Sequence, residues 1–169
     1  MTGIINQIGA KTGIINGTNT ASAGTVSLSG ITGLDYEEGT WDAVMTTTGT
    51  DYTFTGSRST VGSYVKIGKM VIVTANPSIP SPSNGTGNFI ITGLPFPASY
   101  YNGETSVAMG RVTLDQSGAE DYFTQLETGQ TKINFYYNVS QAGVNALPAS
   151  ALNGNATPYL ALTMTYFIQ

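Results

Sequence analysis

From residue 40 onward, the chain alternates short runs of apolar and hydroxyl-bearing residues with turn-forming residues. The runs fall at residues 40–48, 52–55, 62–67, 70–75, 87–92, 105–114, 122–126, 132–139 and 158–168. They are rich in Val, Ile, Thr, Tyr and Phe, which favour strands, and Gly, Asn, Pro and Ser between them favour turns. The pattern predicts an all-β fold, an antiparallel sandwich or barrel, with a jelly-roll-like β-sandwich as the specific topology.

Residues 62–67 and 70–75 are joined by Gly68-Lys69 alone, which predicts a β-hairpin. The second arm has apolar residues on both faces, with Val71, Val73 and Ala75 on one and Met70 and Ile72 on the other. A strand that is apolar on both faces is expected to be covered on both. In residues 132–139, by contrast, apolar residues stand at every second position, which predicts a half-buried strand.

Two stretches are predicted as connections. Residues 77–85 hold three prolines, and each proline lacks the N–H that a β-ladder needs, so this stretch is expected to be an exposed loop. Residues 140–156 are expected to form a second loop, in which residues 147–152 make one helical turn.

The first 34 residues differ from the rest of the chain. Thr2-Gly3-Ile4-Ile5-Asn6 recurs as Thr12-Gly13-Ile14-Ile15-Asn16, and most other positions are Gly, Ser, Thr or Asn. So few large side chains cannot bury a core, and a flexible tail is one interpretation. The other, which we adopt, divides the chain into an N-terminal docking and trimerising arm, residues 1–34, and a β-sandwich display domain, residues 35–169. The arm's candidate docking residues are Ile4, Ile5, Ile8, Ile14 and Ile15.

The composition excludes several kinds of chemistry. The chain has no cysteine and no histidine, which rules out disulfides, thiolate nucleophiles, imidazole zinc ligands and a Ser-His-Asp triad. Its formal net charge is −4 and its six basic residues form no cluster, so nucleic-acid binding is not expected. No apolar run is long enough to span a membrane, and the N-terminus lacks the features of a signal peptide. We therefore expect assembly in a cytoplasm, with no membrane partner, no cofactor and no metal.

The carboxylates gather at one place, where Asp35, Glu37 and Glu38 lie close to Trp41 and Asp42. Close carboxylates can hold a cation or act as a glycosidase pair. The alternating spacing of a calcium loop is absent, however, and no other motif supports hydrolysis. We therefore interpret residues 35–41 as an acidic turn that joins the arm to the sandwich, with Trp41 at the start of the first strand.

Exposed aromatic rings are the second candidate chemistry, because they can stack on sugars through their apolar faces. Trp41, Tyr100 and Tyr101 are the candidate ligand or interface aromatics, and Tyr136 and Tyr159 are weaker candidates of the same kind. Most Tyr and Trp residues of an all-β chain pack in the sandwich or between subunits, which is the alternative for each. The pair Tyr100-Tyr101 stands beside an Asn-Gly turn and is the strongest ligand candidate.

Three strings occur in order: DYEEGTW at 35–41, GSYVKIGKMV at 62–71 and GNFIITGLPF at 87–96. Together they resemble a β-domain of tailed-bacteriophage structural proteins, and the leader INQIGAKTG at 5–13 resembles N-terminal segments of such proteins. The resemblance covers roughly residues 4–96. It implies a homotrimeric, jelly-roll-like virion surface protein of the tail-fibre, head-fibre or capsid-decoration type, and it implies no catalytic residues.

From these observations we expect a non-enzymatic virion structural protein, assembled in the bacterial cytoplasm and placed on the virion surface. The short chain, without a long shaft, favours a trimeric capsid-decorating (cement or head-fibre) protein whose arm docks on the major capsid protein or another virion protein. Three copies of a weakly apolar arm bury a useful area together where one copy does not. The alternative is the receptor-binding tip of a tail fibre that recognises host surface glycans.

Overall fold

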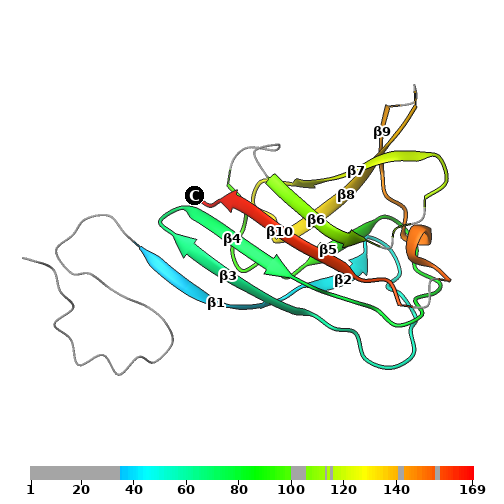
Figure 1. Ribbon diagram of the computed structural model, residues 1–169, viewed down its shortest axis with the longest axis horizontal. Helices are drawn as coiled ribbons and strands as arrows, with labels where there is room; N and C mark the ends of the chain where they lie inside the picture. Colours follow the sequence, from blue (N-terminus) through cyan, green and yellow to red (C-terminus); the bar gives the residue numbers. More distant parts are fainter. Residues whose placement is uncertain (1–34, 100–105, 113, 115, 141–142, 155–156) are drawn as a thin grey trace, which may run out of the picture.

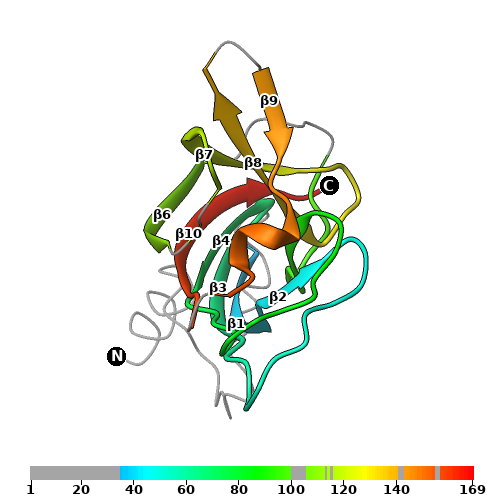
Figure 2. The same ribbon diagram turned by 90° about the vertical axis from the view of Figure 1, so that its right-hand side faces the viewer.

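The computed structural model describes residues 35–99, 106–112, 114, 116–140, 143–154 and 157–169. Within these residues the fold is an all-β sandwich of two antiparallel sheets, as the sequence predicts (Figure 1). A view turned by 90° shows the two sheets as separate layers (Figure 2). The division between an arm and a display domain stays a prediction, because residues 1–34 lie outside the described residues.

Each sheet is built from strands that are distant in sequence. The first, sheet A, has the order β1 (Tyr36–Asp42), β3 (Val61–Ile67), β4 (Met70–Ala75), β10 (Leu160–Phe167) and β6 (Ser106–Val112). The second, sheet B, has the order β2 (Val44–Thr47), β5 (Phe89–Thr92), β8 (Lys132–Val139) and β7 (Ala119–Leu126), and β9 (Gly143–Ala146) pairs with β8. The β8–β9 hairpin projects beyond the body of the sandwich (Figure 2).

The connections wind the chain back and forth between the sheets. Strands β4, β5, β6 and β7 occupy sheets A, B, A and B in turn, and then β8 enters between β5 and β7 while β10 enters between β4 and β6. This insertion of later strands between earlier ones is the winding of a jelly roll. Strands β1, β2 and β3 extend the two sheets at one side.

The core lies between the sheets, on the side chains that alternate inward. Its largest fully buried members include Met45, Phe89, Ile91, Phe135 and Tyr166. The Phe89 and Phe135 rings are 4.7 Å apart, from centroid to centroid, in neighbouring strands of sheet B. Since the chain has no cysteine, this apolar burial is the main stabilising term that the fold has available.

Several predicted elements are confirmed. Strands β3 and β4 form the hairpin across Gly68-Lys69, where Gly68 takes a positive φ of 58°. Ile133 and Phe135 are buried in β8 as its alternation predicts, although Asn134 on the other face is buried as well. The helical turn is a 3-10 helix, Ala149–Leu152, that follows Pro148. No helix in the described part of the chain is long and apolar enough to cross a membrane.

The predicted strand at residues 40–48 is wrong as a single element. It is two strands in different sheets, and the chain crosses between them at the fully buried Ala43. At this crossing Gly93, with φ +95°, lies so close to the Asp42 carbonyl that a Cβ would collide with it. Alanine is compatible with a strand interior and with a connection, so the composition of residues 40–48 does not show that the strand is interrupted at Ala43.

The interpretation of residues 35–41 as an acidic turn is also wrong. Glu37 and Glu38 lie inside β1 and are paired in register with Lys66 and Val65 of β3. Strand pairing therefore begins at Tyr36, five residues before Trp41. Glu37 and Glu38 belong to the edge strand of sheet A, and Asp35 directly precedes it, so these carboxylates do not form a hinge before the strand.

Three further stretches differ from the sequence prediction. Residues 52–55 form no strand, and only Thr53 makes an isolated bridge. Tyr52 is a buried core residue whose hydroxyl donates to the Ala149 carbonyl at 2.9 Å. The proline-rich loop is not simply exposed, because Ile79 within it is fully buried in the core. Strand β9 was not predicted, since its four residues are mostly exposed and show no apolar alternation.

Candidate functional site

The outer face of sheet A has no covering layer among the described residues. In an antiparallel sheet, directly paired residues lie on the same face. Val71, Val73 and Ala75 of β4 are buried against sheet B, so Met70, Ile72 and Thr74 point outward. The register then divides the outer face into rows that run across β1, β3, β4 and β10.

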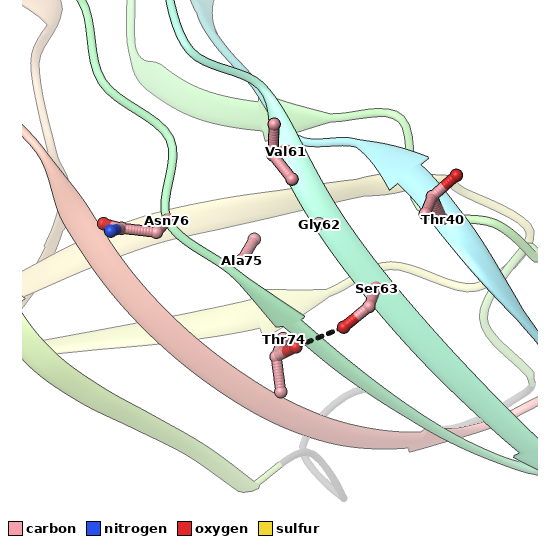
Figure 3. A pocket seen from close by; sticks show the side chains of 7 residues that line it. All are labelled: Thr40, Val61, Gly62, Ser63, Thr74, Ala75 and Asn76. Atoms are coloured by element: carbon pink, nitrogen blue, oxygen red, sulfur yellow. Dashed lines mark hydrogen bonds between the residues drawn. The ribbon is translucent and has the colours of Figure 1, made fainter.

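One end of this face is lined with hydroxyl groups. A single row joins Thr40, Ser63, Thr74 and Thr163, and the Ser63 and Thr74 hydroxyl oxygens are 2.8 Å apart. An open groove of about 350 Å³ lies here, lined by Thr40, Val61, Gly62, Ser63, Thr74, Ala75 and Asn76 (Figure 3). Its hydroxyl and amide groups can donate and accept hydrogen bonds, and its lining contains no charged side chain.

Trp41 lies behind the floor of this groove. Its indole nitrogen donates to the carbonyl oxygens of Ser63 and Thr74, both at 3.2 Å, and only 6% of the residue is exposed. An adjoining depression of about 290 Å³ includes Trp41 in its lining. The ring is nevertheless packed as a core residue, so its faces are not presented to a ligand from solvent. The alternative that most Trp residues in a sandwich are structural fits this placement.

The other end of the outer face is apolar. We call Val65, Ile67, Met70, Ile72 and Phe167 the apolar strip; they come from β3, β4 and β10 and stand in two adjacent rows. Phe167 is 47% exposed, and the other four are half-buried. The sequence predicts that β4 is covered on both faces, but sheet B covers only one, and no described element packs on the strip.

The three carboxylates of residues 35–38 are separated by the geometry of β1. Asp35 pairs with the Lys66 amine, Glu37 accepts a hydrogen bond from the Tyr64 hydroxyl at 2.6 Å, and Glu38 accepts one from the Tyr36 hydroxyl at 2.7 Å. The hydrogen bond to Glu37 raises the pKa of Tyr64. Glu37 and Glu38 point to opposite faces of the sheet, so the sequence neighbours do not converge on one ligand. Among the described residues, no three carboxylates come close enough to hold a metal ion.

Lys66 is the buried charge of this region. It is 7% exposed, faces inward beside Glu37, and its amine lies 5.8 Å from the centroid of the Phe96 ring. The Phe96 ring in turn meets Tyr64 edge to face at 5.4 Å. This cluster closes one end of the sandwich and joins the start of β1 to the loop after β5.

An aromatic pair lies on the outer face of sheet B. Phe123 of β7 and Tyr136 of β8 are directly paired, with ring centroids 5.6 Å apart and planes 15° apart. Asn134, on the same face of β8, donates to Glu127 at 3.0 Å. The sequence singles out Tyr136 but not Phe123, because only the register of β7 against β8 brings the two rings together.

Tyr159, the other weaker candidate, is half-buried and forms an isolated bridge with Ser78. The remaining predicted site residues lie outside the described part of the chain. Tyr100 and Tyr101 lie outside the described residues, as do the arm residues Ile4, Ile5, Ile8, Ile14 and Ile15. The described surface therefore offers a hydroxyl-lined groove, an apolar strip and an aromatic pair. All three suit binding to another molecule.

No known protein family and no curated protein matches the sequence. The fold is similar to part of a solved structure, the crystal structure of the Dettilon tailspike protein (gp208), with a TM-score of 0.59 and 19% sequence identity. The match covers 79% of this chain and 24% of the tailspike chain, so this chain spans about a quarter of the length of that protein. At this identity the likeness is one of fold, and this chain has the β-sandwich architecture of a part of a tailspike protein.

Proposed function

We propose that this chain is a structural protein of the bacteriophage virion surface, in which the β-sandwich is the displayed module. The observation that carries the proposal is the fold likeness to a tailspike protein over 79% of the chain. The sequence strings at residues 35–41, 62–71 and 87–96 support it independently, because they resemble structural proteins of tailed phages.

The proposed role is non-enzymatic. A hydrolase needs carboxylates held together in a cleft, whereas Asp35, Glu37 and Glu38 each have a different partner on β1 or β3. The groove on sheet A is lined by hydroxyl, amide and apolar groups without a carboxylate, and the adjoining depression has one carboxylate, Asp42, instead of a pair. These features suit recognition and packing better than proton transfer.

Within the virion, we propose that the protein decorates the capsid as a homotrimer. In this proposal residues 1–34 dock on the major capsid protein, and the sandwich projects from the lattice. The repeated Ile-Ile pairs at 4–5 and 14–15 are the expected contacts. Each contact gains little alone, and trivalency multiplies the gain.

A second candidate is a receptor-binding module at the tip of a tail fibre, and the tailspike likeness favours it. The ligand would be a host surface glycan. Tyr100 and Tyr101, together with the Phe123–Tyr136 pair on sheet B, are the aromatics that a sugar ring would use. No membrane or nucleic-acid partner forms part of either candidate.

The deciding experiment is quantitative mass spectrometry of purified virions of the phage that encodes the chain. A copy number comparable to that of the major capsid protein supports capsid decoration, and a small number set by the tail fibres supports the receptor-binding module. Absence from purified virions would overturn the proposal as a whole.

A companion experiment tests the docking residues. Ile4, Ile5, Ile14 and Ile15 are changed together to Ser, and binding of the purified protein to undecorated capsids is followed by co-sedimentation. We expect binding to be lost while the protein still unfolds at the wild-type temperature. The matched control changes Thr2 and Thr12, from the same repeat, to Ser. Equal binding by both variants would contradict docking through the isoleucines.

A further inference from the structure

The apolar strip on sheet A has a shape that limits what can cover it. Its first row pairs Ile67 with Met70 and Met70 with Phe167; its second pairs Val65 with Ile72, which faces Thr165. Tyr36 and Glu38 border the two rows on β1. Strands lie about 4.8 Å apart and successive outward residues about 7 Å apart. The strip is therefore about 15 Å long across the strands but only two side chains deep.

This shape suits one extended peptide segment better than a second folded copy. A stable interface between two proteins buries about 800 Å² on each partner, whereas a strip of about 15 Å by 15 Å offers about 200 Å² of flat area at the spacings of a β-sheet. The next row along the face is made of Thr40, Ser63 and Thr74, so the apolar surface does not continue in that direction.

The chain before Asp35 leaves the sandwich at the strip. The Gly68 amide donates to the Asp35 carbonyl at 2.6 Å, and the Asp35 carboxylate pairs with Lys66, so Asp35 is fixed beside the β3–β4 turn. Ile67 and Met70, the two residues that flank this turn, form the first row of the strip. Thirty-four residues precede Asp35, and their connection point is therefore at the apolar end of the face.

The last part of this segment has the length and the side chains that the strip requires. Residues 26–34 span about 30 Å when extended, enough to turn and cross the strip. They contain Val26, Leu28, Ile31 and Leu34, and Gly30 and Gly33 stand between them. Leu28, Ile31 and Leu34 recur at every third position, which places them on one side of an extended polyproline II segment. Glycine adopts the backbone conformations of a sharp turn at low cost.

We propose that residues 26–34 lie across the apolar strip of the same chain, with Leu28, Ile31 and Leu34 against Ile67, Met70 and Phe167. This assignment does not depend on where the protein sits in the virion. It separates the arm into a proximal part that completes the sandwich and a distal part, with the repeated Ile-Ile pairs, that is free for docking. It also accounts for a strand, β4, that is apolar on both faces although one sheet covers only one of them.

The test uses the full chain and its lack of native cysteine. Phe167→Cys places one thiol on the strip, and Val61→Cys places one at the far end of the same outer face, where Val61 is 73% exposed. Maleimide labelling rates are measured for each, with and without the triple change Leu28→Ser, Ile31→Ser and Leu34→Ser. We expect the triple change to speed labelling at residue 167 by about tenfold, because it releases a locally closed segment, and to leave labelling at residue 61 unchanged. Met70→Cys is the second strip reporter if Phe167→Cys does not fold.

A cross-linking arm identifies which copy supplies the segment. The double variant Ile31→Cys, Phe167→Cys is oxidised and run on a non-reducing gel. A cross-link within one chain supports the proposal. A covalent dimer would show that a neighbouring copy supplies the segment, and would overturn the assignment to the same chain. If the triple change leaves the labelling rate at residue 167 unchanged and no cross-link forms, residues 26–34 do not dock on the strip and the proposal is overturned.

Discussion

Trp41 occupies the space that a side chain at residue 62 would need. A Cβ at Gly62 would lie 2.7 Å from Cε2 and 2.8 Å from Cδ1 of the Trp41 ring, closer than packed atoms approach. The two residues are direct partners in the β1–β3 register. Because the indole also donates to the Ser63 and Thr74 carbonyls, the ring cannot move aside without losing these hydrogen bonds.

Gly62→Ala is therefore expected to lower the free energy of unfolding by about 2–3 kcal/mol, the cost of overpacking a core. Urea unfolding followed by Trp41 fluorescence measures it directly, since the chain has one tryptophan. Gly68→Ala is the control, because its positive φ is strained but a Cβ there meets nothing within 4 Å. It should cost only about 1 kcal/mol, for the left-handed backbone conformation.

The double variant Trp41→Ala, Gly62→Ala isolates the contact, and circular dichroism replaces fluorescence in this background. Trp41→Ala costs about 3–5 kcal/mol alone, as large-to-small changes of buried aromatics do. If the two residues interact as described, Gly62→Ala costs much less once the ring is absent. If the losses in unfolding free energy of the two single variants simply add in the double variant, the cost of Gly62→Ala does not come from contact with the Trp41 ring.

The extent to which the sequence predicts this fold depends on whether a residue's environment follows from its immediate neighbours. Val71, Val73 and Ala75 alternate with outward residues, and the hairpin at Gly68 follows from a two-residue connector; both are local signals and both are confirmed. The crossing at Ala43 depends on a partner 50 residues away, Gly93, so no local pattern marks it. Strand β9 pairs through backbone groups while its side chains stay exposed.

The sequence predicts part of the candidate surface. The apolar positions Met70 and Ile72 predict a second covered face for β4, and they belong to the apolar strip. Phe167 joins them only through the pairing of β10 with β4, a contact between residues almost 100 positions apart. The acidic residues gave a misleading signal, because carboxylates close in sequence alternate between two faces once they lie in a strand.

A second prediction concerns tyrosine ionisation. Burial raises the pKa of Tyr52 and of Tyr166, and the hydrogen bond to Glu37 raises the pKa of Tyr64. The pKa of tyrosine in the unfolded chain is 10.0. A tyrosine whose pKa is higher in the folded protein stabilises the fold in full at pH values below 10.0, and this stabilisation is lost as the pH rises through the folded-state pKa. The free energy of unfolding should therefore fall above about pH 10, by up to about 1.4 kcal/mol per pH unit for each of Tyr52 and Tyr166 and by less for Tyr64, whose hydrogen bond to Glu37 is screened by solvent.

Urea unfolding at a series of alkaline pH values measures this slope, and absorbance near 295 nm reports the ionisation. Tyr166→Phe should flatten the slope by the share of one tyrosine, while its loss of the hydrogen bond to the Phe96 carbonyl at 3.0 Å lowers stability at neutral pH. A slope that Tyr166→Phe leaves intact would contradict the role of this residue.

A third prediction concerns the ion pair that fastens the loop between β2 and β3. Arg58 donates to Asp51 at 2.8 Å and to the Met45 carbonyl at 2.9 Å, and its guanidinium lies 4.5 Å from the centroid of the Phe54 ring. Burial alone would raise the pKa of Asp51, but hydrogen bonds from Arg58 and Thr46 hold it below its usual 3.8. The Asp51 carboxylate therefore stabilises the fold at pH values above 3.8, and this stabilisation is lost as the pH falls through the lower pKa of the folded state.

Asp51→Asn should cost less than about 1 kcal/mol at pH 7, because the pair is partly exposed and screened. The difference from wild type should disappear in acid. Arg58→Ala should cost more, at about 1–2 kcal/mol, since it also removes the contact with Phe54 and the bond to the Met45 carbonyl. Thermal unfolding from pH 7 down to about pH 2 compares the two variants. A pH-independent effect of Asp51→Asn would mean that the ion pair is not its cause.

The last prediction separates charge from packing at Lys66. The residue is 7% exposed, pairs with Asp35 and lies beside Glu37 in the register. Lys66→Glu would put a third carboxylate beside these two and leave it without a cation, so the free energy of unfolding should fall by about 3–5 kcal/mol. Lys66→Met keeps an unbranched apolar side chain at this position and removes the charge. It should cost no more than about 1 kcal/mol, because the Asp35 side chain is 66% exposed and stays hydrated, and Glu37 keeps its hydrogen bond from Tyr64. Urea unfolding of the two variants is measured side by side. Equal losses would mean that removal of the ammonium group, and not the added carboxylate, accounts for the loss of stability, and would contradict the small cost expected for Lys66→Met.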